Sequence, residues 1–261
     1  MAFARKRFGQ NFLNDQGIIA QIIAALGASP QDQVIEIGPG RGALTQVLLK
    51  QLNHLTVIEI DRDLFARLQY FSHAEKLTAI CDDVLKVDFS SFGHDLRIIG
   101  NLPYNISTPL MFHLLQYRSH IKDMVFMLQA EVVDRLLAPV SSPNYGRLSV
   151  MFQYYCHVER MFDVPPESFD PAPRVNSAVI ALRLKQQDET VSFSELEAVV
   201  AKAFAMRRKT LANNFKGILQ AADWETLGIS SQQRAQDVPL EGFLSMAMYF
   251  ARLKKMDKEL T

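Results

Sequence analysis

The four residues from Asn101 to Tyr104 place an amide, a main-chain carbonyl, a restricted backbone and an aromatic ring in one short segment. The Asn101 side-chain oxygen and the Leu102 carbonyl could both accept hydrogen bonds from an exocyclic purine amine. Such an amine is a poor nucleophile because its lone pair is delocalised into the ring. It gains positive charge as it attacks an electrophilic methyl group, and fixed dipoles aimed at that charge favour the reaction.

Pro103 and Tyr104 fit the same chemistry. Pro103 has a restricted backbone and no N–H, so it helps to fix the direction of the neighbouring carbonyl. Tyr104 offers a face for an extruded base, and stacking of this kind contributes about 1–3 kcal/mol. We therefore predict that Asn101–Tyr104 perform methyl transfer to an adenine amine. The competing interpretation is a proline-containing turn whose tyrosine packs in the core.

Phe169 is a candidate for a second stacking face. It lies in a proline-rich loop, Glu167–Val175, that could hold the ring stiffly over the site. A loop aromatic anchored in the core is the alternative, and the sequence does not decide between the two.

A glycine cluster predicts the place of a nucleotide cofactor. Gly38 and Gly40 follow a short apolar run and precede a helical pattern, where glycines let the backbone turn sharply and approach a ligand. Glu59, 21 positions after Gly38, could accept hydrogen bonds from both hydroxyls of a ribose. These features fit a nicotinamide cofactor as well. Glu36, which could orient the loop or a methionine amino group, and Asp83, which could hold an adenine amine, favour S-adenosylmethionine.

The elements that must position these residues alternate between strand and helix. Each polar cluster comes directly after a short apolar run, and such alternation predicts a mostly parallel sheet with helices on both faces, in the Rossmann-like α/β class. Ligands of such sheets bind beyond the carboxyl ends of the strands. The predicted strands are Val34–Ile37, Leu55–Ile60, Leu77–Cys81, Leu96–Ile99 and Met124–Leu128.

The pattern changes in the second half of the chain. Leu148–Val158 and Ser177–Leu184 are predicted to form a late antiparallel hairpin that completes the sheet. Apolar residues at helical spacing follow a polar linker near residue 187, for instance Phe193, Leu196 and Val200. We therefore predict a catalytic domain over residues 1–186 and a small all-helical domain over residues 187–261.

Composition limits the class of protein. Twenty-eight basic and 28 acidic residues give a formal net charge of zero, so any RNA-binding charge must be gathered locally. No apolar run reaches the length of a membrane span, and no signal peptide is evident, which predicts a cytoplasmic protein. Cys81 and Cys156 lie far apart in apolar runs, so we expect buried free thiols and no metal site.

These motifs together resemble the ribosomal RNA adenine dimethyltransferase family, and most closely its small-subunit members. The resemblance covers nearly the whole chain. It implies that Asn11, Leu13, Ile60 and Val84 also contact S-adenosylmethionine. It further implies transfer of two methyl groups to each of two adjacent adenosines near the 3′ end of small-subunit ribosomal RNA, on an immature subunit, by a monomer. Segments that carry the resemblance are Arg5–Leu13, Glu36–Thr45, Glu59–Asp61, Asp83, Asn101–Tyr104, Gln129–Val133, Tyr145–Ser149 and Phe169–Ser177.

RNA binding is predicted for basic residues in several parts of the chain. A basic run is more often a solvated surface, but the family resemblance favours phosphate contacts, which position RNA without identifying its sequence. The candidates are Arg5, Lys6, Arg7, Arg147, Arg174, Arg207, Arg208 and Lys209.

Three rival functions stay open at this point. Related enzymes methylate large-subunit ribosomal RNA, and a substrate comparison separates them from the small-subunit type. A non-catalytic assembly factor would bind the subunit without transferring methyl groups. A nicotinamide dehydrogenase would need a hydride-transfer base, which is not evident in the sequence.

Overall fold

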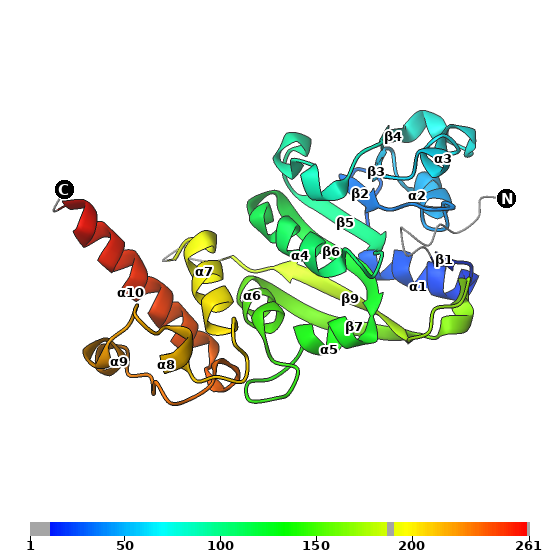
Figure 1. Ribbon diagram of the computed structural model, residues 1–261. Coiled ribbons are helices and arrows are strands. Elements are labelled where there is room, and N and C mark those ends of the chain that lie inside the picture. The colour runs from blue at the N-terminus through cyan, green and yellow to red at the C-terminus, as the bar shows by residue number, and fades with distance from the viewer. Residues whose placement is uncertain (1–10, 187–190, 260–261) are drawn as a thin grey trace. The chain divides into compact units, whose positions relative to one another are not determined.

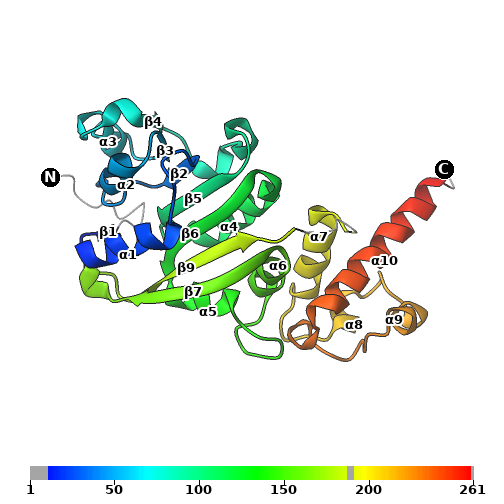
Figure 2. The ribbon, with the colours of Figure 1, turned by 180° about the vertical axis from the view of Figure 1, so that it is seen from behind.

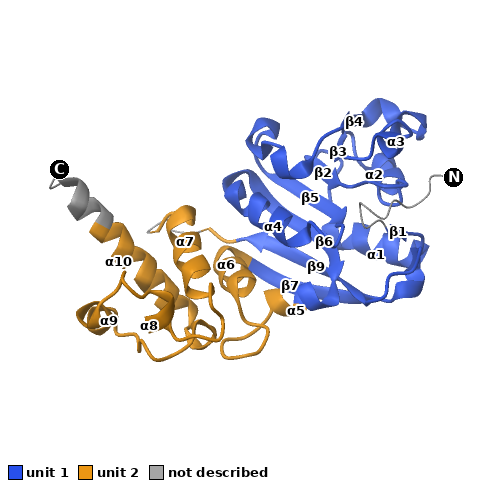
Figure 3. Ribbon diagram, viewed as in Figure 1, with its two compact units in different colours: residues 1–133, 157–184 blue, residues 134–156, 185–261 orange. Residues whose placement is uncertain are grey.

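The chain folds into two compact units. The computed structural model describes residues 11–186 and 191–259, with side chains described as far as residue 253. The first unit takes in the described chain up to Val133 together with His157–Leu184 (Figure 3). The second takes in Asp134–Cys156 together with the described chain from Lys185 onward. The second unit is thus built from two chain segments, whereas the sequence analysis divided the chain at a single point.

A seven-stranded sheet forms the centre of the first unit. Its strand order is β4-β3-β2-β5-β6-β9-β7, and the pairs among β2, β3, β4, β5 and β6 are parallel while β9 runs antiparallel to β6. The predicted mostly parallel sheet with a late antiparallel hairpin, β7 and β9, is confirmed (Figure 1). The strands are β2 (Val34–Ile37), β3 (Leu55–Ile58), β4 (Leu77–Ile80), β5 (Leu96–Asn101), β6 (Ile121–Gln129), β7 (Cys156–Val164) and β9 (Ser177–Leu184).

Helices cover both faces of this sheet. Helix α1 (Gln16–Leu26) contacts β6 and β9, and α4 (Ser107–Gln116) lies on the opposite face (Figures 1 and 2). Asp15 caps α1 by accepting hydrogen bonds from the backbone N–H groups of Gly17 and Ile18. The other helices of this unit are α2 (Thr45–Gln51) and α3 (Arg62–Phe65), and α5 (Ala130–Leu136) leads into the second unit.

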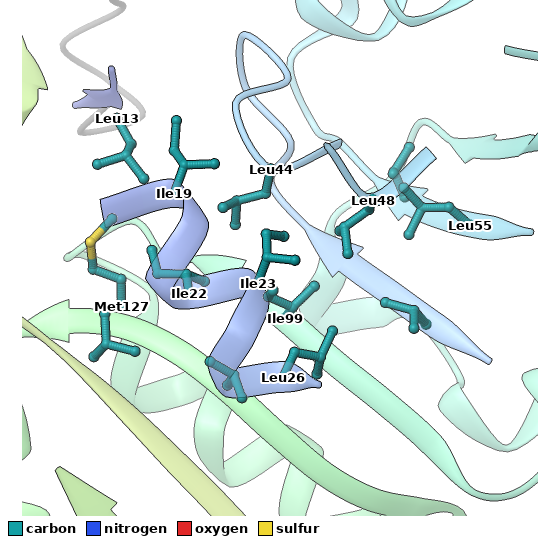
Figure 4. Packing of buried hydrophobic residues seen from close by; sticks show 14 of the residues in the cluster. Leu13, Ile19, Ile22, Ile23, Leu26, Leu44, Leu48, Leu55, Ile99 and Met127 are labelled. Carbon is teal, nitrogen blue, oxygen red and sulfur yellow. The ribbon is translucent and has the colours of Figure 1, made fainter. Parts of the chain in front are cut away.

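The core beneath α1 is aliphatic. Ile19, Ile22, Ile23 and Leu26 recur every three or four residues, so all four face the sheet and are buried. They pack against side chains of α2 and the central strands (Figure 4).

A second, very short sheet joins the start of the described chain to the loop before β9. Strand β1 (Phe12–Leu13) pairs antiparallel with β8 (Phe169–Asp170), with Phe12 opposite Asp170 and Leu13 opposite Phe169. This pairing links two segments that are distant in the sequence and brings the proline-rich loop next to the glycine cluster.

The predicted strand Leu148–Val158 was wrong over most of its length. Residues Arg147–Tyr155 form helix α6, and strand β7 begins only at Cys156. A short apolar run does not distinguish a buried helix from a buried strand, and here most of the helix is buried. Ser149 Oγ accepts a hydrogen bond from the Gly146 N–H and so begins the helix.

The second unit is helical. It consists of α6, α7 (Phe193–Ala203), α8 (Leu211–Asn214), α9 (Ala221–Leu227) and α10 (Leu240–Glu259). Helix α7 packs against α6, α8 and α10 through its buried face, which confirms the predicted all-helical region. Within the described ranges no helix is long and apolar enough to cross a membrane. Of the two cysteines, Cys156 is buried as predicted, but Cys81 is exposed because β4 is the edge strand of the sheet.

Candidate active site

The carboxyl ends of β2, β3, β4 and β5 open into one pocket in the first unit. Parallel register brings them together, since Ile37 pairs with Ile58 and Ile58 with Ile80. Each of the residues predicted to contact a cofactor lines this pocket: Asn11, Leu13, Glu36, Gly38, Gly40, Glu59, Ile60, Asp83, Val84 and Asn101. The structure therefore brings together side chains that are spread over 90 residues of sequence.

The glycine loop is held by Glu59, at the end of β3. The Glu59 carboxylate accepts one hydrogen bond from the Gly40 N–H at 3.2 Å and another from the Asp61 N–H at 2.8 Å. Gly40 has a φ of +58°, which strains any residue with a side chain, and a Cβ there would lie 3.2 Å from the Phe12 ring, a tight contact. A carboxylate has further lone pairs, so Glu59 can brace the loop and still accept from a ribose hydroxyl.

Glu36 is a buried acid in the same pocket. It is only 1% exposed, and Thr45 Oγ1 donates a hydrogen bond of 2.7 Å to its Oε2 atom. Burial raises the pKa of Glu36 to about 8, although the hydrogen bond from Thr45 opposes that shift and the nearby Glu59 adds to it. At neutral pH this carboxyl is therefore mostly protonated in the free protein.

The residues that follow β4 form another wall of the pocket. Asp83 Oδ1 accepts from the Leu85 N–H, which begins a short helical turn with Val84 buried beneath it. Ile60 is 48% exposed at the pocket, an apolar surface of the kind that suits a purine ring. Asp83 and Ile60 thus supply a polar edge and an apolar face to the same part of the pocket.

The tip of β5 carries the predicted catalytic residues. Asn101 Nδ2 donates a 3.0 Å hydrogen bond to the main-chain oxygen of Asn11, which fixes the orientation of the amide. Since Asn11 offers an acceptor, the Asn101 amide nitrogen must face it, and Oδ1 is left to accept hydrogen bonds. The Leu102 N–H donates a 3.1 Å hydrogen bond to the Met127 oxygen, which ties the tip of β5 to β6. Asn101, Leu102 and Pro103 all line the pocket.

Tyr104 lies beside them at the pocket wall, where it is partly buried. Its hydroxyl shares a 2.9 Å hydrogen bond with Ser177 Oγ, at the start of β9. Burial raises the pKa of Tyr104, so the phenol stays neutral at physiological pH. The ring is thus held from its far end, with its faces free of a second aromatic partner among the described ring pairs.

Phe169 does not share this site. Its side chain is only 4% exposed and belongs to the aliphatic core cluster, because the pairing of β8 with β1 turns it inward. In this arrangement Phe169 is a packing residue, and the predicted second stacking face is not offered to the pocket.

Several pocket residues had not been singled out from the sequence. Arg41 lies with its guanidinium carbon 4.2 Å from the centre of the Phe12 ring, and its Nη1 is 2.8 Å from Asp170 Oδ2. Asn105 and Ile106 extend the tip beyond Tyr104. The sequence feature that could have identified them is their position next to the glycine cluster, for Arg41, and next to Tyr104, for Asn105 and Ile106.

The predicted RNA-binding residues are scattered. Arg5, Lys6 and Arg7 lie outside the described residues. Arg174 is exposed in the loop before β9, and Arg147 forms a 2.9 Å ion pair with Glu197 inside the second unit. The run from Arg207 to Lys209 is exposed in the connection between α7 and α8.

Comparison with known proteins shows which family the chain belongs to. The family model described as ribosomal RNA adenine dimethylase matches residues 1–252. The chain belongs to the ribosomal RNA adenine dimethylase family. It is accordingly an enzyme of the methyltransferase class, and family and fold imply the use of S-adenosylmethionine.

Two curated relatives show how close this family membership is. The chain is 50% identical over 250 residues to the ribosomal RNA small subunit methyltransferase A of Legionella pneumophila (strain Lens), covering 95% of this chain and 98% of that one. It is 50% identical over 254 residues to the protein of the same name from Methylobacillus flagellatus, with the same coverage.

Two solved structures share the fold. A dimethyladenosine transferase from Plasmodium falciparum, 27% identical, matches with a TM-score of 0.76 over 92% of this chain and 98% of that one. The 23S rRNA methyltransferase ErmE, 23% identical, matches with a TM-score of 0.67 over 91% and 98%, which shows likeness of fold alone.

The buried acid of this dimethylase predicts a pH-dependent stability. In the unfolded chain Glu36 ionises near its ordinary value of 4.5, whereas the folded protein holds the proton until about pH 8. Folding therefore takes up a proton between these values, and stability falls as the pH rises through that range; below pH 4.5 both states are protonated.

Replacing Glu36 with Gln removes this titration. We expect the melting temperature of Glu36→Gln, relative to the unmodified protein, to rise steadily between pH 5 and pH 8, on top of a constant offset from the new amide. Thermal unfolding of both ligand-free proteins at four pH values measures the difference. A difference that does not change with pH would show that Glu36 is ionised in the folded state.

Proposed function

We propose that the protein transfers methyl groups from S-adenosylmethionine to the N6 amines of two adjacent adenosines near the 3′ end of small-subunit ribosomal RNA. The carrying observation is the tip of β5, where the Asn101 amide is anchored to Asn11 and where Asn101 and Leu102 both line a pocket whose other walls suit an adenosine cofactor. The substrate assignment is supported by the name of the two relatives that are 50% identical over 95% of the chain.

The residues of the pocket fit S-adenosylmethionine. Glu59 can accept from the ribose hydroxyls and Asp83 from the adenine amine, while Ile60 and Val84 cover the purine. Glu36 is an acid suited to the methionine end. When bound, this cofactor supplies an electrophilic methyl group on a sulfonium. Across the described lining, four acids stand against a single basic residue, Arg41, which matches a ligand of net positive charge.

The tip then acts on the target base. Asn101 Oδ1 and the Leu102 carbonyl accept hydrogen bonds from the two amine hydrogens and stabilise the positive charge that develops on the nitrogen during attack. Tyr104 stacks on the extruded adenine and resists its return to the RNA. The proton leaves the nitrogen after methyl transfer, so the tip needs no strong base, in keeping with the neutral Asn101 amide.

Dimethylation places a further demand on the same atoms. After the first transfer one amine hydrogen is replaced by a methyl group, so only one hydrogen bond to the two carbonyls survives in the second step. The pocket must therefore accept a methyl group where a hydrogen was. Transfer of the second methyl group needs the base to stay stacked, which is the role we assign to Tyr104.

Exposed cations of the second unit are our proposed contact with ribosomal RNA. Arg207 donates hydrogen bonds to the carbonyls of Pro143 and Tyr145, so its replacement would also loosen that loop. Arg208 and Lys209 are exposed and make no side-chain hydrogen bond or ion pair that the structure records among the described residues. They can therefore be changed without breaking an internal contact.

Reversing these two charges is expected to weaken binding to the small subunit. The double variant Arg208→Glu and Lys209→Glu should raise the Kd by about tenfold or more at moderate salt and lower the salt dependence of binding, since each lost phosphate contact reduces the slope by about 1. Affinity for S-adenosylmethionine should stay within about twofold. The matched control is Arg62→Glu with Arg67→Glu, an equal charge reversal on exposed residues of the first unit. Equal loss in both double variants would show that net charge and not this site governs binding.

The proposed reaction is tested on its substrate. Immature small subunits, incubated with the protein and isotopically labelled S-adenosylmethionine, should yield ribosomal RNA with two dimethylated adenosines in one fragment near the 3′ end by mass spectrometry. Label in protein-free large-subunit RNA instead would assign the activity to the other branch of the family. We also propose that the protein acts as a cytoplasmic monomer, and light scattering of the purified protein measures the oligomeric state.

A further inference from the structure

Thr45 contributes a second buried group behind the cofactor pocket. It is the first residue of α2 and is fully buried, and its hydroxyl lies 2.7 Å from the Glu36 carboxyl oxygen Oε2. The hydrogen bonds that act on this carboxyl come from Thr45, through its hydroxyl and its main-chain N–H. Thr45 itself does not line the pocket, so any effect it has on a ligand passes through Glu36.

Within the part of the chain that the structure describes, no basic side chain bonds to Glu36. Its charged and titratable neighbours around the pocket come from four elements, and the only basic one among the described lining residues is Arg41, which is paired with Asp170. The others are acids or a phenol, and among them Glu59 disfavours a second negative charge. These neighbours are Glu59 after β3, Asp82 and Asp83 after β4, and Tyr104 after β5.

A buried carboxyl in such surroundings keeps its proton until a cation arrives. The proposed cofactor carries two cationic groups, a sulfonium and an α-ammonium. The sulfonium must face the tip of β5 for methyl transfer, and Glu59 is already engaged with the glycine loop and the ribose. The ammonium is therefore the group left to meet Glu36.

We propose that Thr45 is a positioning residue that holds the Glu36 carboxyl toward the α-ammonium group of the cofactor, and that cofactor binding drives one proton from Glu36 into solvent. This inference rests on the proposed function, because it takes S-adenosylmethionine as the ligand. It goes beyond that function by coupling cofactor affinity to pH through the Glu36 proton, and by assigning the position of that carboxyl to Thr45, which does not line the pocket.

The coupling has a definite sign. Between about pH 6 and pH 7 the free protein carries the proton and the complex does not, so affinity increases with pH by about tenfold per unit for one proton released. Burial holds the pKa of free Glu36 at about 8, which places this whole interval below the midpoint. Glu36→Gln has no proton to lose and should show no such dependence.

Calorimetric titration in buffers of different ionisation enthalpy measures the proton count directly. Near pH 6.5 the unmodified protein should release close to one proton on binding S-adenosylmethionine, and also on binding S-adenosylhomocysteine, which keeps the ammonium but lacks the sulfonium. It should release none on binding 5′-methylthioadenosine, which lacks the ammonium. Absence of proton release with the first two ligands overturns the proposal without any variant.

Variants of Thr45 then test its positioning role. Thr45→Val keeps the shape and loses the hydroxyl, and it should bind S-adenosylmethionine at pH 7 about tenfold or more weakly, as expected for a lost hydrogen bond to a charged group. Its affinity for 5′-methylthioadenosine should change by less than about twofold, because that ligand has no ammonium group to contact the Glu36 carboxylate. Thr45→Ser should restore most of the affinity.

The outcomes separate this proposal from the proposed function. Equal weakening of both ligands in Thr45→Val, or unchanged binding of S-adenosylmethionine, contradicts the positioning role. Failure of the unmodified protein to bind S-adenosylmethionine at all would instead refute the cofactor assignment. A Thr45→Val protein that does not fold leaves the proton count of the unmodified protein and of Glu36→Gln as the deciding measurements.

Discussion

Replacing Asn101 with Ala is expected to lower kcat for methyl transfer by about 10²–10³-fold, the range seen when one preorganised hydrogen-bonding group is removed from a reaction centre. The variant loses the oxygen that faces the target amine. It also loses the 3.0 Å hydrogen bond to the Asn11 main-chain oxygen, so Asn11, a residue of the pocket lining, is held less firmly. Single-turnover transfer to small subunits measures the chemical step apart from product release.

Asn101→Asp is the matched variant for this prediction. It keeps the shape and an acceptor oxygen but has no N–H to donate to Asn11, so a carboxylate would face a carbonyl. We expect it to be as inactive as the alanine variant. Binding of the small subunit should be nearly unchanged in both, since the cations assigned to RNA lie elsewhere. Methyl transfer at the rate of the unmodified protein in Asn101→Ala would refute the role given to the tip of β5.

The second large effect is expected at Glu59. Glu59→Ala should raise the Kd for S-adenosylmethionine by about 100-fold, because hydrogen bonds to a charged group contribute about 1.5–3 kcal/mol each. The variant loses the hydrogen bonds to the ribose. It also loses the 3.2 Å hydrogen bond from the Gly40 N–H, which holds the glycine loop in shape. Calorimetric titration measures the affinity.

A graded series checks this assignment. Glu59→Gln keeps one acceptor oxygen, which cannot accept hydrogen bonds from the Gly40 N–H, the Asp61 N–H and the ribose hydroxyls together. Its affinity for S-adenosylmethionine should therefore lie between those of the unmodified protein and Glu59→Ala. Asp83→Asn, at the other end of the predicted adenosine site, should raise the Kd by less. It alters one polar contact with the cofactor and leaves the contacts that hold the glycine loop intact. An unchanged Kd in Glu59→Ala would place the cofactor elsewhere.

The sequence was sufficient to predict where the site lies. Parallel strands that end in polar residues must bring those residues to one edge, so Glu36, Glu59, Asp83 and Asn101 can be grouped from the sequence alone. They line one pocket because the strands that precede them are neighbours in the sheet, in an order that the structure shows and the sequence pattern did not specify. Local turn chemistry also pointed to the glycine loop.

Contacts between distant segments could not be predicted. The bond from Asn101 to Asn11 and that from Tyr104 to Ser177 join residues 90 and 73 positions apart, and neither leaves a periodic trace in the sequence. Phe169 could not be placed because its direction depends on the pairing of β8 with β1, which involves only two residues on each side. Helix α6 was mistaken for a strand because burial on most of its surface removes the helical alternation of polar and apolar residues.

We propose that the oxygens of Asn101 and Leu102 face the methyl donor across a space that admits a purine. A crystal structure of the protein with S-adenosylhomocysteine tests it most directly. We expect the thioether sulfur beside the tip of β5, with Asn101 Oδ1 and the Leu102 carbonyl directed into an open space next to Tyr104. A sulfur turned toward another wall of the pocket, or a tip covered by other side chains, would contradict the account.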